Sequence, residues 1–118
     1  TEVCTPGYYK VNLRHSGVEV ELTATQRVGL SSYRYPAEAG RTALLVDLEN
    51  GGCWDKVTEA DITVIDDTHI AGYRHSTGWA KNQRLWFYAE FSKPFTSCRS
   101  VAGHHWVLDF DKTDQLMV

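Results

Sequence analysis

The strongest constraint on the fold is a period-two alternation of polar and apolar residues that recurs along the chain. Tyr9, Val11 and Leu13 alternate with polar residues, and the alternation resumes in Val18–Thr23 after the turn sequence 14–17. Successive side chains of a strand point to opposite faces of a sheet, so this pattern predicts a hairpin with one buried and one solvated face. The alternation recurs in four further segments, Asp61–Ile65, Ile70–Arg74, Leu85–Phe91 and Trp106–Phe110.

No stretch keeps a helical period long enough to predict a helix. Apolar residues spaced for one helix face never persist beyond about two turns. Short strands separated by turn residues instead indicate an all-β, antiparallel fold. Thr42–Leu48 is apolar on both faces, which predicts a central strand. A two-sided strand among one-sided ones favours an antiparallel β-sandwich, and the uneven strand lengths favour it over a closed barrel.

The size and charge of the chain limit its partners. Its 118 residues suffice for one domain with its own hydrophobic core. The net charge of −3, without a basic stripe, argues against nucleic acid and anionic membranes as partners. No apolar run reaches the roughly 20 residues that span a bilayer. For the three cysteines, Cys4, Cys53 and Cys98, we expect small buried or half-buried thiols, with one disulfide and one free thiol as the alternative.

The polar residues do not form a recognisable catalytic or metal-binding motif. Asp66–Thr68 fits a turn, where aspartate side chains bind the local backbone, and Asp109 and Asp111 fall on the polar face of the last alternating strand. The adjacent pair His104–His105 would point to opposite faces of a strand, so the two rings would not bind one ion together. Motifs for serine hydrolases and nucleotide sites are absent. The sequence therefore predicts no catalytic residue and no metal ligand of its own.

Aromatic residues make up 12% of the chain and are the best candidates for ligand contacts. Sugars stack their apolar faces on aromatic rings, while neighbouring polar groups bind the hydroxyls. The candidate rings are Trp54, Tyr73, Trp79, Trp86 and Trp106. Alternation places Trp106, Phe87 and Phe91 in the core and leaves Trp79, in a polar loop, as the main surface candidate. A lid over one end of the sandwich is the alternative role for Trp79.

Two segments resemble signature sequences of glycoside hydrolase family 92. Val20–Pro36 reads VELTATQRVGLSSYRYP and is similar to the family segment ELTAT-x-R-x-G-x-H-R-Y-x-F-P. Ile70–Phe95 reads IAGYRHSTGWAKNQRLWFYAEFSKPF and is similar to the family segment GxRxSxGWAxxQxxYFxxEFSKPF. Two positions depart from the pattern, since Ser32 stands where the family usually has His, and Tyr35 where it has Phe.

The resemblance implies a part of a larger enzyme. It implies an exo-acting, calcium-dependent, inverting α-mannosidase of bacteria. In such enzymes a mutarotase-like N-terminal β-sandwich precedes a larger helical catalytic domain. Residues 1–118 would then be a single domain, a portion of that sandwich in an α-1,2-mannosidase. The missing catalytic domain would be its partner and would supply the general acid, the general base and the calcium. This portion would be inactive alone and have no cofactor of its own. The resemblance also implies a secreted, periplasmic or outer-surface protein.

Three functional hypotheses remain open at this point. In the first, the domain packs on the catalytic domain and shapes a pocket for a mannose-containing glycan. Arg74 and Trp79 are then our candidates for substrate-binding residues near the domain interface, on their chemistry alone. In the second, the chain is a free-standing carbohydrate-binding module that uses surface aromatics. In the third, it is a structural domain that self-associates through exposed strand edges or an apolar patch.

Overall fold

The computed structural model describes residues 1–118 and contains eleven β-strands and no helix. The strands are β1 (Glu2–Thr5), β2 (Tyr8–Asn12), β3 (Glu19–Ala24), β4 (Gly29–Arg34), β5 (Thr42–Asp47), β6 (Lys56–Asp66), β7 (His69–Thr77), β8 (Gln83–Glu90), β9 (Phe95–Val101), β10 (His105–Phe110) and β11 (Gln115–Met117). All strand pairings are antiparallel, which confirms the predicted fold class. The structure has no helix with the length and apolarity needed to cross a membrane.

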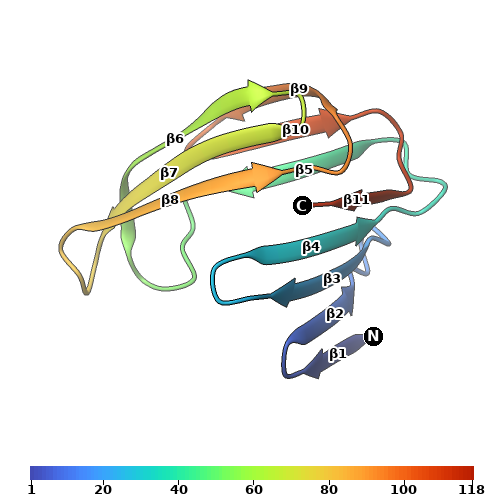
Figure 1. Cartoon of the computed structure of the whole chain (residues 1–118), viewed down its shortest axis with the longest axis horizontal. Helices are drawn as coiled ribbons and strands as arrows, with labels where there is room; N and C mark the ends of the chain where they lie inside the picture. The colour runs from blue at the N-terminus through green and yellow to red at the C-terminus, as the bar shows by residue number, and fades with distance from the viewer.

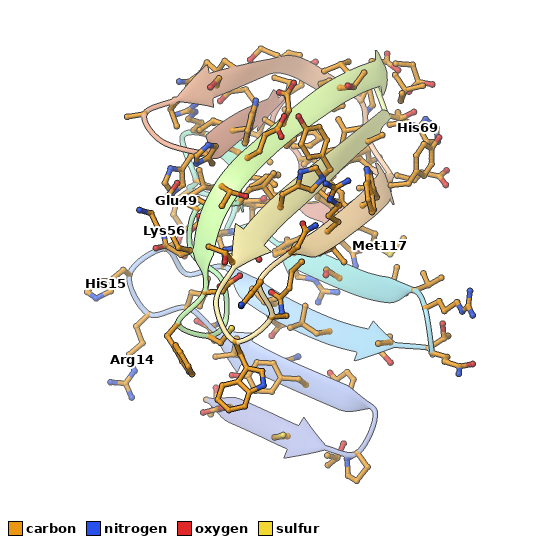
Figure 2. The ribbon with its side chains drawn as sticks, turned by 90° about the vertical axis from the view of Figure 1, so that its left-hand side faces the viewer. Arg14, His15, Glu49, Lys56, His69 and Met117 are labelled. Atoms are coloured by element: carbon orange, nitrogen blue, oxygen red, sulfur yellow. The ribbon has the colours of Figure 1, made fainter.

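The strands form three sheets in two layers. Sheet β6-β7-β8 lies in front of sheet β5-β10-β9, and the larger sheet β1-β2-β3-β4-β11 extends away from them (Figure 1). Figure 2, turned by 90°, separates the two three-stranded sheets and places His69 and Glu49 on opposite sides. Strand β11 meets the end of β8, where the backbone N–H of Ser92 donates to the Met117 carbonyl at 2.9 Å. The predicted β-sandwich is therefore confirmed.

The hydrophobic core lies where the three sheets meet. Its buried cluster comprises Tyr35, Ile70, Phe91, Phe95, Leu108, Phe110 and Leu116. Phe91, Phe95 and Phe110 contact one another with ring centroids 5.8–6.3 Å apart, in the edge and tilted geometries that aromatic rings prefer. Trp106 and Phe91 are buried, and Phe87 is half-buried against the cluster, so the alternation assigned these rings correctly.

The predicted hairpin of β2 and β3 is present, and β6 and β7 are longer than the alternating segments Asp61–Ile65 and Ile70–Arg74 indicated. Strand β2 pairs with β3, and the turn between them has Gly17 at φ 69°, a conformation that glycine adopts without steric cost. Strands β6 and β7 meet at the predicted turn, where Asp66 Oδ1 accepts the backbone N–H of Thr68 at 2.9 Å. These local signals depend only on neighbouring residues, which is why the sequence contained them.

Two expectations were wrong. Strand β5 is not central: it lies at the edge of its sheet with β10 as its one neighbour, and Leu45 is 59% exposed. The two-sided apolar pattern indicates burial on both faces but does not report whether a second strand is present to pair with it. Cys4 and Cys53 are exposed rather than buried, and all three cysteines are free. Only Cys98 is half-buried, and burial raises the pKa of its thiol.

Candidate functional site

Two exposed tryptophans meet at one end of the sandwich. Trp54 lies in the loop between β5 and β6, and Trp79 lies in the loop between β7 and β8. Their ring centroids are 6.3 Å apart, and the planes cross at 82°, so one indole edge faces the other indole. Trp54 is 78% exposed and Trp79 is 89% exposed. We refer to this pair as the aromatic corner.

An ion pair joins β7 to the loop that contains Trp54. Arg74 of β7 donates to Asp55 through Nη1 to Oδ2 at 2.5 Å and through Nη2 to Oδ1 at 3.3 Å. Both side chains are nearly buried. The hydrogen bonds from Arg74 lower the pKa of Asp55 to about 2, so the carboxylate stays ionised at neutral pH. The two parallel N–H donors of Arg74 fix the orientation of the Asp55 carboxylate as well as stabilise its charge.

The Arg74 guanidinium also binds the first residues of loop 48–55, whose last residue is Asp55. Its Nε donates to the Leu48 carbonyl at 2.8 Å, and its Nη2 donates to the Glu49 carbonyl at 3.4 Å. Arg74 therefore closes loop 48–55 at both ends. Its donors are engaged by the protein itself, which favours a positioning role for this predicted site residue.

Two glycines let the loops approach this ion pair. A Cβ atom on Gly51 would lie 2.3 Å from Asp55 Oδ1 and 3.0 Å from Arg74 Nη2. A Cβ atom on Gly78 would lie 3.0 Å from both the Cα and the Cβ of Asp55. Real Cβ contacts are rarely so short, so both positions need glycine for the present packing. Because Gly78 directly precedes Trp79, the packing on Asp55 also fixes where the Trp79 loop begins.

A second group of aromatic side chains lies on the solvent side of sheet β6-β7-β8. The Tyr73 hydroxyl donates to Glu59 at 2.8 Å, and the rings of Tyr73 and His75 lie 4.8 Å apart. The Trp86 ring meets the His75 ring at 5.6 Å and is 63% exposed. His75 Nε2 is buried without a hydrogen-bond partner. Two of the predicted candidate rings, Tyr73 and Trp86, therefore lie on this face, away from the core.

The carboxylates and histidines pair locally. Asp66 binds the β6–β7 turn and lies 2.7 Å from Nδ1 of His69, which is the first residue of β7. Asp109 accepts hydrogen bonds from Arg41 and Ser97, and those from Arg41 hold its pKa below the usual range. No group of three or more histidine, cysteine or acidic side chains has the arrangement of a metal site.

One open hollow of about 270 Å³ lies on the five-stranded sheet. It is lined by Tyr8, Glu21, Leu22, Thr23, Leu30, Ser32, Gln115 and Met117. The Tyr8 hydroxyl is bound to Glu21 at 2.6 Å within it. None of the predicted site residues lines this hollow, so it does not coincide with the aromatic corner.

The comparison with known sequences decides the family. The chain matches the profile of the glycosyl hydrolase family 92 N-terminal domain over residues 1–115. The chain belongs to this family. Two structures of the family GH92 alpha-mannosidase BT3965 from Bacteroides thetaiotaomicron, one in complex with mannoimidazole, have the same fold, each with a TM-score of 0.87 and 24% identity. The match covers 98% of this chain and 19% and 18% of those chains, so the chain spans about a fifth of their length. No curated protein matches the chain.

The two family 92 signature segments map onto strand pairs. Val20–Pro36 covers β3 and β4, and Ile70–Phe95 covers β7 and β8. At the departures from the pattern, the Tyr35 hydroxyl donates to the Ala43 carbonyl at 3.1 Å, and Ser32 accepts a hydrogen bond from Gln115 at 3.0 Å. Both side chains are therefore satisfied within the domain.

The family segment places Trp79 and Arg74 but not their partners. Trp54 was one of five candidate rings in the sequence, yet nothing there paired it with Trp79, and Asp55 was not singled out. The contacts join loops about 25 positions apart, and alternation does not report such distances. The one local signal was Gly51–Gly52 just before Trp54, a pair typical of a tight loop.

Proposed function

We propose that the chain is a non-catalytic portion of the N-terminal β-sandwich domain of an α-mannosidase, acting on α-1,2-linked mannose, and that it packs on a catalytic domain in the same longer protein. The observation that carries this proposal is the family match over residues 1–115. The fold likeness to a GH92 alpha-mannosidase about five times longer supports it. A secreted, periplasmic or outer-surface location belongs to the same proposal.

The chemistry of these 118 residues is consistent with a supporting role. Inverting glycoside hydrolysis uses two carboxyl groups about 6.5–9.5 Å apart with a water between them. Asp55, Asp66 and Asp109 are each engaged by the local fold. Calcium takes about six to eight oxygen ligands, and the residues here do not fit such a site. We therefore assign the general acid, the general base and the calcium ligands to the catalytic domain.

Within this proposal, the domain shapes the outer part of the sugar pocket. Trp79 is the residue we expect nearest the sugar, because its indole is exposed in a loop among polar side chains. Arg74 lies behind it and holds the loops through Asp55. The glycan and the catalytic domain are thus the two partners of this end of the sandwich.

Expression of the complete gene tests the proposal. The full-length protein should release mannose from α-1,2-mannobiose, whereas residues 1–118 alone should release none. Chelation of calcium in the full-length protein should abolish the release. A complete reading frame that encodes no catalytic domain, or a full-length protein inactive on every α-mannoside, would overturn the assignment.

A free-standing carbohydrate-binding module is the second candidate. The exposed Trp86 and the half-buried Tyr73 on the β6-β7-β8 face are the observation that favours it. Calorimetric titration of residues 1–118 with mannose oligosaccharides separates the two functions. Binding that is lost in Trp86→Ala but kept in Trp79→Ala would favour the module, because only the first ring lies on that face.

A further inference from the structure

The aromatic corner serves no purpose in the core of the domain. Trp54 and Trp79 leave more than three quarters of their surface in solvent, whereas a large aromatic ring is usually buried. Neither ring belongs to the core cluster or packs against it. An exposed pair of indoles at a loop end is instead a surface for contact with a ligand or partner.

The aromatic corner is also held in a defined place. Trp54 directly precedes Asp55, and Trp79 directly follows Gly78, which packs on Asp55. Asp55 in turn is fixed by Arg74, which binds both ends of the Trp54 loop. One nearly buried ion pair therefore sets the backbone next to both indoles. Because both loops are already held in place, less conformational entropy is lost when their side chains bind a ligand.

We propose that Trp54 and Trp79 form a binding corner for a hexopyranose ring, and that the Arg74–Asp55 ion pair positions both indoles. The crossed rings offer one flat indole face and one edge to a ligand. A pyranose has an apolar C–H face that stacks on indole, as well as hydroxyls that need polar partners. Lys81 and Asn82, exposed in the Trp79 loop, supply such partners. The choice of mannose as the sugar rests on the proposed function.

Sugar titration tests the contact. Residues 1–118 are titrated with α-1,2-mannobiose, and binding is followed by tryptophan fluorescence and calorimetry. Trp54→Ala and Trp79→Ala should each weaken the apparent Kd by about 2- to 10-fold, the range expected for one lost aromatic contact. Tyr8→Ala is the control, because that aromatic ring is also exposed but lies on the five-stranded sheet, away from both candidate sugar sites. Unchanged affinity in both corner variants, or no binding by the parent chain, would overturn the contact.

Positioning needs a readout that general destabilisation does not move. Two indoles in contact produce an exciton couplet in far-ultraviolet circular dichroism, and Trp54→Phe identifies the part of the spectrum that belongs to the corner. Arg74→Lys keeps the charge but loses the fork, so the couplet should shrink and the Kd should weaken together. Arg41→Lys is the control, since Arg41 binds Asp109 instead.

Two glycine variants test the positioning role without replacing Arg74, so the test does not depend on whether Arg74→Lys folds. Gly78→Ala places a methyl group against Asp55 without removing any charge, so it should displace the Trp79 loop and shrink the couplet. Gly52→Ala lies in the Trp54 loop with nothing within 4 Å of the new Cβ, so it should leave the couplet intact. A full couplet in both Arg74→Lys and Gly78→Ala would show that the ion pair does not position the indoles.

The outcomes also separate this inference from the proposed function. If the full-length protein cleaves α-mannosides while Trp54→Ala and Trp79→Ala keep the parental KM, the corner inference fails and the proposed function stands. If the full-length protein is inactive on α-mannosides while the corner binds mannobiose and depends on Arg74, the proposed function fails and the corner stands.

Discussion

Glu49 Oε2 lies 2.5 Å from His104 Nδ1, a contact that ties loop 48–55 to the turn before β10. Asp47 and His105 form a parallel contact of 3.2 Å between Oδ1 and Nε2. The hydrogen bond from His104 holds the pKa of Glu49 below its usual value. Figure 2 places Glu49 far from His69, so the Glu49–His104 contact is independent of the His69–Asp66 contact.

The Glu49–His104 contact predicts an acid-sensitive contribution to stability. Because the folded state lowers the pKa of Glu49, its contribution is complete above the usual value of 4.5 and is lost as pH falls through the lower folded-state value. Glu49→Gln should therefore be less stable than the parent at neutral pH, and the difference should shrink on acidification. Urea unfolding at a series of pH values measures it. Glu38→Gln, exposed and without an ion pair, should show no such change. A constant difference at all pH values would contradict the assignment.

The core cluster predicts a large loss of stability at Leu108. This side chain is 0% exposed and lies on β10 between the other two strands of its sheet. Leu108→Ala should lower the free energy of unfolding by about 2–5 kcal/mol, because it removes buried methyl groups and leaves a cavity. Leu85→Ala, at an exposed leucine, should change it by less than about 0.5 kcal/mol. Similar losses in both variants, in urea or thermal melts, would contradict the position of the core.

Gly72 predicts a steric effect in the middle of β7. A Cβ atom there would lie 2.5 Å from the Phe87 ring and 2.9 Å from the Asp61 carbonyl oxygen. Gly72→Ala should therefore destabilise the domain by about 1–3 kcal/mol, since both the ring and the strand backbone must move. Gly29→Ala in β4 meets no atom within 4 Å and should be neutral or stabilising by up to about 1 kcal/mol. Equal midpoints for the parent and Gly72→Ala in thermal unfolding would refute the close packing of Phe87 on Gly72.

The sequence predicted the strands whose side chains alternate and missed those that do not. Strands β2, β3, β7, β8 and β10 each have one apolar face, which makes the period visible. Strand β4 reads GLSSYR, and β9 reads FTSCRSV, so small polar residues hide the alternation. Their place is decided by pairing: β4 pairs with β3 and with the distant β11, and β9 pairs with β10 through a bulge. Periodicity reports the faces of a strand and not its partners.

The sequence likewise predicted only part of the candidate site. The sequence placed Trp79 in an exposed loop because polar and turn residues surround it. It did not reveal that Arg74 points to Asp55, because an arginine on a strand has the same local pattern with or without a buried partner. The ion pair joins positions 19 residues apart, which lie close together in the folded β6–β7 hairpin. A tertiary contact of this kind depends on how the whole chain folds and leaves no local pattern in the sequence.

The free edge of strand β5, which is not the central strand that its sequence predicted, leads us to predict self-association. Its outer edge has no strand partner, and Leu45 exposes an apolar side chain there. Natural proteins protect such edges with charges, bulges or a covering segment, and β5 carries no charge between Thr42 and Val46. Residues 1–118 should therefore associate through this edge in a concentration-dependent way, measured by sedimentation velocity.

Leu45→Lys should reduce that association, because a charged side chain at the edge opposes pairing with a second strand. Leu30→Lys is the matched control: Leu30 is also exposed, but β4 already pairs with β3 and β11 on both sides. If Leu30→Lys disperses the chain as well as Leu45→Lys does, general surface apolarity drives the association. A monomer at every concentration would instead mean that the free edge of β5 is too short or too twisted to recruit a partner strand.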